Sequence, residues 1–251
     1  ERVISEFLKL ICGKDAVKIL DAYRETIAVI IPEITVMFNF NQNNIHHSYD
    51  LWQHTLTALG TIEPNPILRM TMLLHDIGKP SVKTTDNSGQ SHFQGHQLES
   101  KKIADRILHR LRLPSDFINK TLLLIEYHDV RFNGSKKLMK KVMNVLGTDL
   151  TKQLLEVEYA DISAQSEYQR EEKLGYLETA KTHLNEIIKD NECFKLSQLD
   201  INGKDVLNLG VKEGRDVGNI LDYLLMLVVD ANVPNKKSIL ISKAKEYIYG
   251  N

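Results

Sequence analysis

Apolar side chains recur every three or four positions along most of this chain, which is the spacing of one buried face of an α-helix. The pattern begins with Phe7, Leu8 and Ile11 and resumes over residues 17–23. Only 6 prolines and 13 glycines interrupt the 251 residues, and hydrophobic residues make up 42% of them, enough for a sizeable core. We therefore predict an all-α fold that opens with two helices before a break at Pro32.

Further helices are predicted wherever this period returns between turn residues. They cover about residues 51–60, 67–78, 97–111, 116–127, 136–146, 151–165, 167–189, 203–209, 214–229 and 236–251. Gly78 is the predicted C-terminal cap of its helix, because glycine tolerates the left-handed conformation, and Pro80 prevents continuation. Residues 37–49, rich in Asn, Gln and His, predict a long ordered loop, and residues 83–92 predict a turn or short hairpin.

Charge gives no general reason to expect a nucleic acid or a membrane as partner, because 32 basic and 33 acidic residues leave a net charge of −1. The longest apolar run, residues 220–229, is far shorter than the roughly 20 residues of a membrane span. RNA contacts would need local basic groups, each of which fits a solvated helix face equally well. Two such groups are Arg131 with Lys136, Lys137, Lys140 and Lys141, and Arg106 with Arg110 and Arg112.

The two cysteines, Cys12 and Cys193, fit no metal-binding spacing and are interpreted as reduced thiols. Since no signal peptide is recognisable either, we expect a cytoplasmic protein. The first residue is Glu1 rather than Met, so we expect the sequence to be part of a longer chain. The pattern predicts nothing about the oligomeric state.

Histidines and aspartates occupy positions where helices are predicted to end or to carry an apolar face. They are His54, His75, Asp76, His96, His128 and Asp161. Each alone is explained more simply as a core or surface group, but together they offer the imidazole and carboxylate ligands that divalent ions accept. His75 and Asp76 are about 100° apart around a helix, so both reach one ion only near its last turn, which is where “LLHDIGKP” places them.

The order of these residues, a histidine, then His-Asp, then an isolated aspartate, resembles the HD-domain family of metal-dependent phosphohydrolases. The resemblance implies that His54, His75, Asp76 and Asp161 hold a divalent ion, which these mixed ligands would allow to be Mn, Fe, Co, Ni, Zn or Mg. It also implies that His96 and His128 serve a second ion, bridged by Asp76, or protonate the leaving oxygen. One ion is expected, and two are an alternative.

A closer resemblance covers nearly the whole chain and is carried by “YDLWQHTLTAL”, “LLHDIGKP”, “HFQGHQLES”, “LLEVEYADISAQS” and “LSQLDINGKDVLNLGVKEGRDVGNILDYLLMLV”. These stretches resemble the C-terminal part of bacterial CCA-adding tRNA nucleotidyltransferases of the poly(A) polymerase family. The resemblance implies an N-terminal helical segment over 1–45, an HD domain over 46–165 and a helical tail over 166–251. The Asp-x-Asp of that family's polymerase head has no counterpart, so we expect no nucleotide addition by this segment alone.

The expected chemistry is hydrolysis of a nucleotide phosphomonoester or, as the resemblance implies, a 2′,3′-cyclic phosphodiester. In this hypothesis His75 and Asp76 act at the metal, Asp76 also accepts a proton from the attacking water, and Lys79 neutralises phosphate oxygens. The alternative for Lys79 is a solvated charge after a helix end. Weaker candidates for the wall of the pocket are His47, Tyr49 and His92.

Two other functions remain open at this level. The chain could be a catalytically quiet body that binds tRNA for a missing head, with tRNA reached through the parent enzyme. It could also be a free-standing HD phosphohydrolase that acts on a small nucleotide. A metal-dependent hydrolysis assay and the upstream coding sequence would separate these functions.

Overall fold

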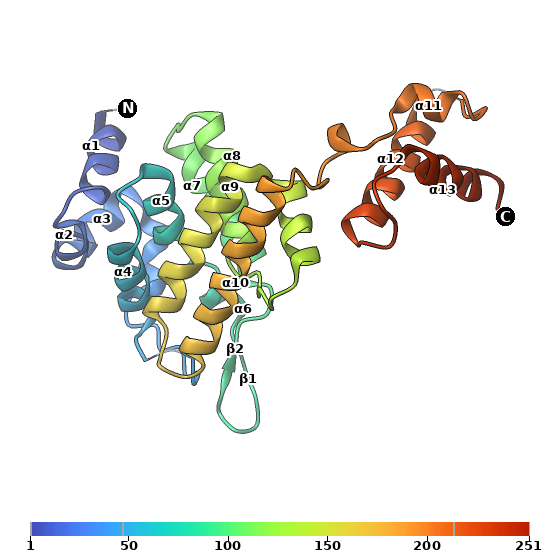
Figure 1. Ribbon diagram of the computed structural model, residues 1–251. Helices are drawn as coiled ribbons and strands as arrows, with labels where there is room; N and C mark the ends of the chain where they lie inside the picture. Colours follow the sequence, from blue (N-terminus) through green and yellow to red (C-terminus); the bar gives the residue numbers. More distant parts are fainter. Residues whose placement is uncertain (1, 47, 213, 251) are drawn as a thin grey trace. The chain divides into compact units, whose positions relative to one another are not determined.

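The computed structural model describes residues 2–46, 48–212 and 214–250, and α-helices dominate it (Figure 1). The only strands in these ranges are β1 (Thr84–Thr85) and β2 (Ser91–His92), which pair antiparallel. This confirms the predicted all-α fold and the predicted hairpin. Within the same ranges, no helix combines the length and apolar character needed to cross a membrane.

The chain divides into two compact units. Unit 1 comprises Glu1–Arg131 and Lys152–Leu177, and unit 2 comprises Phe132–Thr151 and Glu178–Asn251. The helices α9 (Lys136–Ala164) and α10 (Arg170–Lys189) each contribute to both units. Each unit is therefore described by itself.

Unit 1 contains the first eight α-helices and one 3₁₀ helix. They are α1 (Arg2–Ile11), α2 (Ala16–Ala22), α3 (Arg24–Ile30), η1 (Pro32–Met37), α4 (Leu51–Thr61), α5 (Pro66–Leu74), α6 (Lys79–Val82), α7 (His96–Arg110) and α8 (Ser115–Tyr127). Two opening helices were predicted before Pro32, and the structure has three. The chain breaks at Tyr23 between α2 and α3, without the glycine or proline that would have revealed a boundary.

The core of unit 1 forms where α4 and α5 pack together, with α2 against α4 and α8 against α5. Asp50 begins α4 by accepting a hydrogen bond from the Gln53 amide, and Asn65 begins α5 in the same way before Pro66. Trp52 on α4 is completely buried, and its indole nitrogen donates to Asp21 on α2. These caps and contacts fix the two helices that carry His54 and His75.

The predicted role of Gly78 as a left-handed cap is wrong. Its φ of −81° is right-handed, and α5 already ends at Leu74. A Cβ atom on Gly78 would lie 2.5 Å from the Ser100 amide nitrogen and 2.7 Å from the His96 carbonyl oxygen on α7. The glycine is required because α7 passes against the backbone, a long-range contact that local sequence does not reveal.

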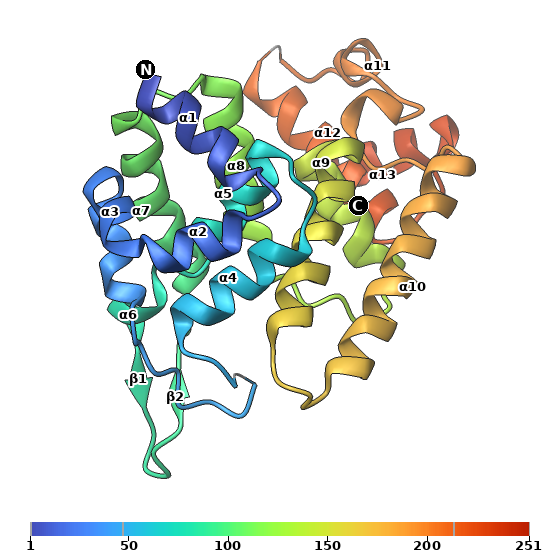
Figure 2. The same ribbon diagram turned by 90° about the vertical axis from the view of Figure 1, so that its left-hand side faces the viewer.

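Two breaks predicted from the sequence are present. The predicted end of a helix near residue 146 corresponds to Gly147, whose φ of 71° interrupts α9. After α5, Pro80 lies in the first turn of the short helix α6, and the chain continues into the β1–β2 hairpin, which extends away from the helices of unit 1 (Figures 1 and 2).

Unit 2 has its own apolar core. Besides parts of α9 and α10 it contains η2 (Leu196–Gln198), α11 (Gly203–Leu207), α12 (Arg215–Val229) and α13 (Lys237–Tyr249). Helix α12 packs against α11 and α13, and the buried cluster includes Val206, Leu224 and Leu240. Asn202 begins α11, because its side chain accepts hydrogen bonds from the Lys204 and Asp205 amides in a capping box.

Candidate metal centre

Five helices of unit 1 bring the predicted histidines and aspartates together. His54 lies within α4, His75 and Asp76 follow the last residue of α5, and His96 is the first residue of α7. His128 follows the last residue of α8, and Asp161 lies in the last turn of α9. These positions therefore place polar groups at one point while the helix bodies bury apolar surface.

One group of four residues, His54, His75, Asp76 and Asp161, presents ligand atoms that all lie within 4.8 Å of one another. Asp161 Oδ1 is 2.8 Å from His54 Nε2 and 3.4 Å from His75 Nε2. Asp76 Oδ2 is 3.2 Å from His75 Nε2 and 3.6 Å from His54 Nε2. Two imidazoles and two carboxylates thus surround one point.

A second group shares Asp76 with the first. The other carboxylate oxygen, Oδ1, is 3.2 Å from His96 Nε2 and 3.5 Å from His128 Nε2. The two histidine Nε2 atoms are 3.1 Å apart. Asp76 therefore faces one group with each of its oxygens and belongs to both.

A hydrogen bond from Nδ1 to a backbone carbonyl holds each of the four histidine rings in place. His75 Nδ1 donates to the Met72 carbonyl at 2.7 Å, His128 Nδ1 to Ile125 at 2.7 Å, His96 Nδ1 to Phe93 at 2.9 Å and His54 Nδ1 to Ala164 at 3.2 Å. A carbonyl oxygen can only accept, so each Nδ1 carries a proton and each Nε2 faces the Asp76 carboxylate. Metal-binding histidines in proteins are held in this way.

The cluster fits a cation, because two of its buried polar atoms lack hydrogen-bond partners in the described part of the chain. His75 Nε2 and Asp76 Oδ1 are buried and have no hydrogen-bond partner among the described residues. Burial opposes a charge on His75, but the neighbouring carboxylates of Asp76 and Asp161 outweigh it and raise the His75 pKa to about 10. The pocket thus requires positive charge, which a proton or a divalent ion can supply.

Lys79 is buried rather than solvated. Its ammonium lies 2.6 Å from Asp76 Oδ2 and donates to the Gln42 side-chain oxygen at 3.1 Å. Burial raises the pKa of Asp76, but His75 and Lys79 lower it further, so the carboxylate stays ionised. Gln42 was not predicted as a site residue, although it lies in the polar loop predicted over residues 37–49.

Two further residues beside Asp161 were also missed. The Gln165 side-chain nitrogen donates to Asp161 Oδ2 at 2.7 Å. Glu158, one turn earlier on α9, is buried, and burial together with Asp161 and Asp129 raises its pKa well above the usual value. The i, i+3 and i, i+4 spacing from Asp161 was the only signal in the sequence that could have found them.

The residues predicted for the pocket wall lie outside these two groups. His92 is on the exposed hairpin, where its Nε2 contacts Asp86 Oδ2 at 2.8 Å. Tyr49 is 49% exposed in the loop before α4. His47 falls outside the described residues. His109, interpreted as a surface residue, is exposed and lies 3.2 Å from Asp105.

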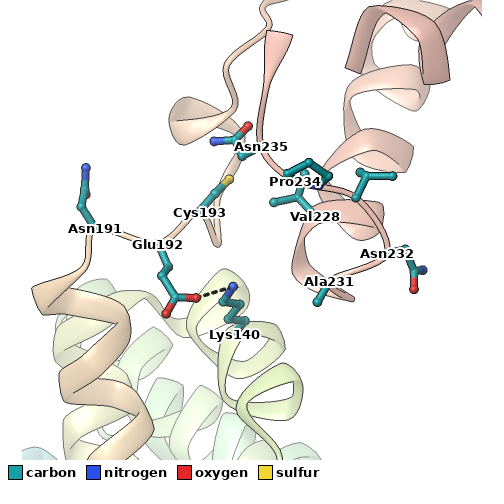
Figure 3. A pocket seen from close by; sticks show the side chains of 10 residues that line it. Lys140, Asn191, Glu192, Cys193, Val228, Ala231, Asn232, Pro234 and Asn235 are labelled. Carbon is teal, nitrogen blue, oxygen red and sulfur yellow. Dashed lines mark ion pairs between the residues drawn. The ribbon is translucent and has the colours of Figure 1, made fainter. Parts of the chain in front are cut away.

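The lysines considered for RNA binding begin α9 in unit 2, and all four contact carboxylates. Lys136 and Lys140 contact Glu192 at 2.5 Å and 2.7 Å, and Lys137 and Lys141 contact Asp230 at 3.1 Å and 3.0 Å. Lys140, Glu192 and Cys193 also line an open cavity of about 550 Å³ (Figure 3). An RNA phosphate would have to compete with these ion pairs. Arg131, the fifth residue of this predicted basic group, belongs to unit 1.

Comparison with known proteins identifies relatives of this fold. Over 249 residues the chain is 29% identical to the CC-adding tRNA nucleotidyltransferase of Thermus thermophilus. This alignment covers 94% of this chain and 54% of that protein. It is 28% identical over 155 residues to the multifunctional CCA protein of Legionella pneumophila (57% of this chain, 37% of that protein). It is 29% identical over 140 residues to the A-adding tRNA nucleotidyltransferase of Deinococcus radiodurans (52% and 32%).

The chain spans about half the length of the first of these relatives, and about a third of the other two. The family model described as tRNA nucleotidyltransferase domain 2 matches residues 96–244, more than half of the sequence. That segment includes His96, His128 and Asp161, while the other members of the two metal-ligand groups precede it. On this match, the chain belongs to the tRNA nucleotidyltransferase domain 2 family.

Proposed function

We propose that this chain carries a divalent-metal-dependent phosphohydrolase site of the HD type, within an HD domain over residues 46–165 of a tRNA nucleotidyltransferase. The observation that carries the proposal is the set of four histidines whose Nδ1 atoms are held by backbone carbonyls while their Nε2 atoms face two carboxylates. A structural core would not need buried polar atoms without partners, such as His75 Nε2 and Asp76 Oδ1, because leaving them unpaired is costly.

In this proposal His54, His75, Asp76 and Asp161 would hold one ion, and Asp76, His96 and His128 would hold a second. A bound divalent ion lowers the pKa of water towards neutrality and withdraws charge from phosphoryl oxygens. Mixed imidazole and carboxylate ligands suit Mn, Fe, Co, Ni and Zn, and Mg less well.

The protein's own groups would orient the reaction. Asp76 would take the proton from the attacking water. Lys79 contacts Asp76 and Gln42, which supports a role in keeping that carboxylate ionised more than direct phosphate binding. The expected substrates are nucleotide phosphomonoesters or 2′,3′-cyclic phosphodiesters.

The test is hydrolysis of a nucleoside monophosphate and a 2′,3′-cyclic nucleotide by the protein loaded with Mn, Co, Ni, Zn or Mg. Asp76→Asn should lower kcat at least 100-fold, because it removes a ligand of both groups and the proton acceptor. His109→Ala, which removes an exposed imidazole of the same unit, should leave kcat unchanged. No hydrolysis by folded wild-type protein with any of the ions would refute the proposal.

The competing function is a catalytically quiet body that binds tRNA. Family membership favours it, because the names of the relatives refer to nucleotide addition to tRNA. Binding of tRNA by a protein that shows no metal-dependent hydrolysis would support this function, and the metal-ligand groups would then stabilise the fold only.

A further inference from the structure

Three basic side chains outside the metal-ligand groups gather beside Asp161. They are His46 in the loop before α4, Arg131 after α8 and Lys173 in the first turn of α10, all within unit 1. The Lys173 ammonium is 2.6 Å from the Gln165 side-chain oxygen and 3.5 Å from His46 Nδ1. Arg131 is exposed and within electrostatic range of both other groups.

Gln165 connects this basic cluster to the metal centre. Its amide oxygen accepts from Lys173, and its amide nitrogen donates to Asp161 Oδ2 at 2.7 Å. The two bonds fix the orientation of the amide, since only the oxygen can accept and only the nitrogen can donate. One side chain therefore separates the Lys173 ammonium from a carboxylate of the centre.

Lys173 forms no direct ion pair with a carboxylate among the described residues, although Asp161 and Asp129 lie near enough to attract it. Among the described residues, the hydrogen-bond partners of Lys173 are the neutral groups of Gln165 and His46. Burial lowers the pKa of Lys173, Asp161 and Asp129 act against this, and Arg131 lowers it further. Burial, Lys173 and Arg131 all lower the pKa of His46. Glu171 and Glu172 share the first turn of α10 but are exposed.

A phosphate group has the chemistry that such a cluster would bind. An ammonium and a guanidinium donate charge-assisted hydrogen bonds to phosphate oxygens, and Lys173 also lies at the N-terminal end of the 20-residue helix α10, where the helix dipole favours an anion.

We propose that Lys173, Arg131 and His46 form an anion-binding site that holds a phosphate group of the substrate on the Asp161 side of the metal centre. This inference rests on the proposed phosphohydrolase function. It adds a substrate-binding residue, Lys173, that does not hold metal and belongs to no motif recognised in the sequence.

The experiment compares wild type with Lys173→Gln, which removes the charge but keeps a group able to donate a hydrogen bond to Gln165. With p-nitrophenyl phosphate and Mn²⁺, KM should rise about tenfold while kcat changes less than about twofold, and inorganic phosphate should inhibit about tenfold more weakly. Lys173→Arg should recover most of the affinity. Lys102→Gln, which removes an exposed lysine of the same unit, is the matched control.

The metal content of the same samples, measured by mass spectrometry, distinguishes phosphate binding by Lys173 from an indirect role in holding the metal. If Lys173→Gln loses metal, Lys173 acts through Gln165 on Asp161, and the anion-binding site is refuted. Unchanged KM and unchanged phosphate inhibition would also refute it.

If wild type hydrolyses nothing, the proposed function fails, and the anion-binding site is decided separately by calorimetric titration of the Mn-loaded protein with inorganic phosphate. Weaker binding by Lys173→Gln than by Lys102→Gln would support the site, and equal binding would refute it.

Discussion

Asp76 illustrates how a single carboxylate can organise a site. It is 1% exposed, faces four histidines and lies 2.6 Å from the Lys79 ammonium. Removing one partner of a buried ion pair leaves the other charge in a medium that solvates it poorly, which costs more than the pair contributes. Variants that remove a charged partner of Asp76 should therefore be strongly destabilised.

Lys79→Met should lower the free energy of unfolding of the metal-free protein by about 3 kcal/mol, because Asp76 then loses its closest cation. Urea unfolding at neutral pH would measure the change. Lys102→Met, at an exposed lysine paired with Glu99, should change stability by less than about 0.5 kcal/mol. Equal effects of the two variants would mean that Lys79 does not compensate Asp76.

His128→Ala should separate the two metal-ligand groups. It removes a ligand from the group of Asp76, His96 and His128 but leaves His54, His75 and Asp161 intact. We expect bound metal to fall from two equivalents to one, measured by mass spectrometry after dialysis against Mn²⁺. One equivalent in both wild type and variant would show that the second group holds no ion.

At the scale of elements, the position of α7 depends on the absence of a side chain at Gly78. Gly78→Ala should lower the free energy of unfolding by about 3 kcal/mol, because the new Cβ would press on the backbone of α7 and displace His96 from Asp76. Gly175→Ala in α10, where a Cβ meets no atom within 4 Å, should be neutral or slightly stabilising. Denaturant unfolding of both variants measures the difference, and a tolerated Gly78→Ala would contradict the close approach.

In unit 2, Asp230 joins the start of α9 to the end of α12 through Lys137 and Lys141. Burial raises the Asp230 pKa, but hydrogen bonds from Lys141 and Lys137 lower it below 3.8 overall. The pairs therefore stabilise the folded protein above pH 3.8, and this contribution is lost as the pH falls through the lower folded pKa.

Asp230→Asn should accordingly cost roughly 1 kcal/mol at pH 7, and the difference from wild type should disappear in acid. Urea unfolding across the acidic range measures this pH dependence. Asp222→Asn, on the exposed face of the same helix, should show no such dependence. A difference that persists in acid would assign the effect to something other than the ion pairs.

Across the whole molecule, the metal-ligand groups lie in unit 1, and unit 2 has a separate core around α12. The single tryptophan, Trp52, is buried in unit 1 two residues from His54, so its fluorescence reports the unfolding of that unit. Adding Mn²⁺ should raise the melting temperature seen by Trp52, because an ion that binds only the folded state stabilises it. Asp76→Asn should abolish the shift, and a shift retained by that variant would place the ion elsewhere.

The helical period of the sequence predicted most helices, because amphipathic helices display their buried face directly in the order of residues. The grouping of His54, the His75–Asp76 pair and Asp161 was expected from a family resemblance, and the structure brings these residues together. The role of Gly78, the burial of Lys79 and the contact of Gln42 depend on segments far apart in the chain, so no local pattern could reveal them.

The hydrogen bonds that join the four histidine rings to backbone carbonyls also limit which ions the centre can accept. A ring held in this way cannot rotate to adapt to a larger or smaller ion without breaking its hydrogen bond to the main chain. The positions of the helices therefore set the distances between the Nε2 atoms of the four histidines. We therefore expect the centre to discriminate among divalent ions by radius, with ions that are too large bound weakly even when their preference for nitrogen ligands is strong.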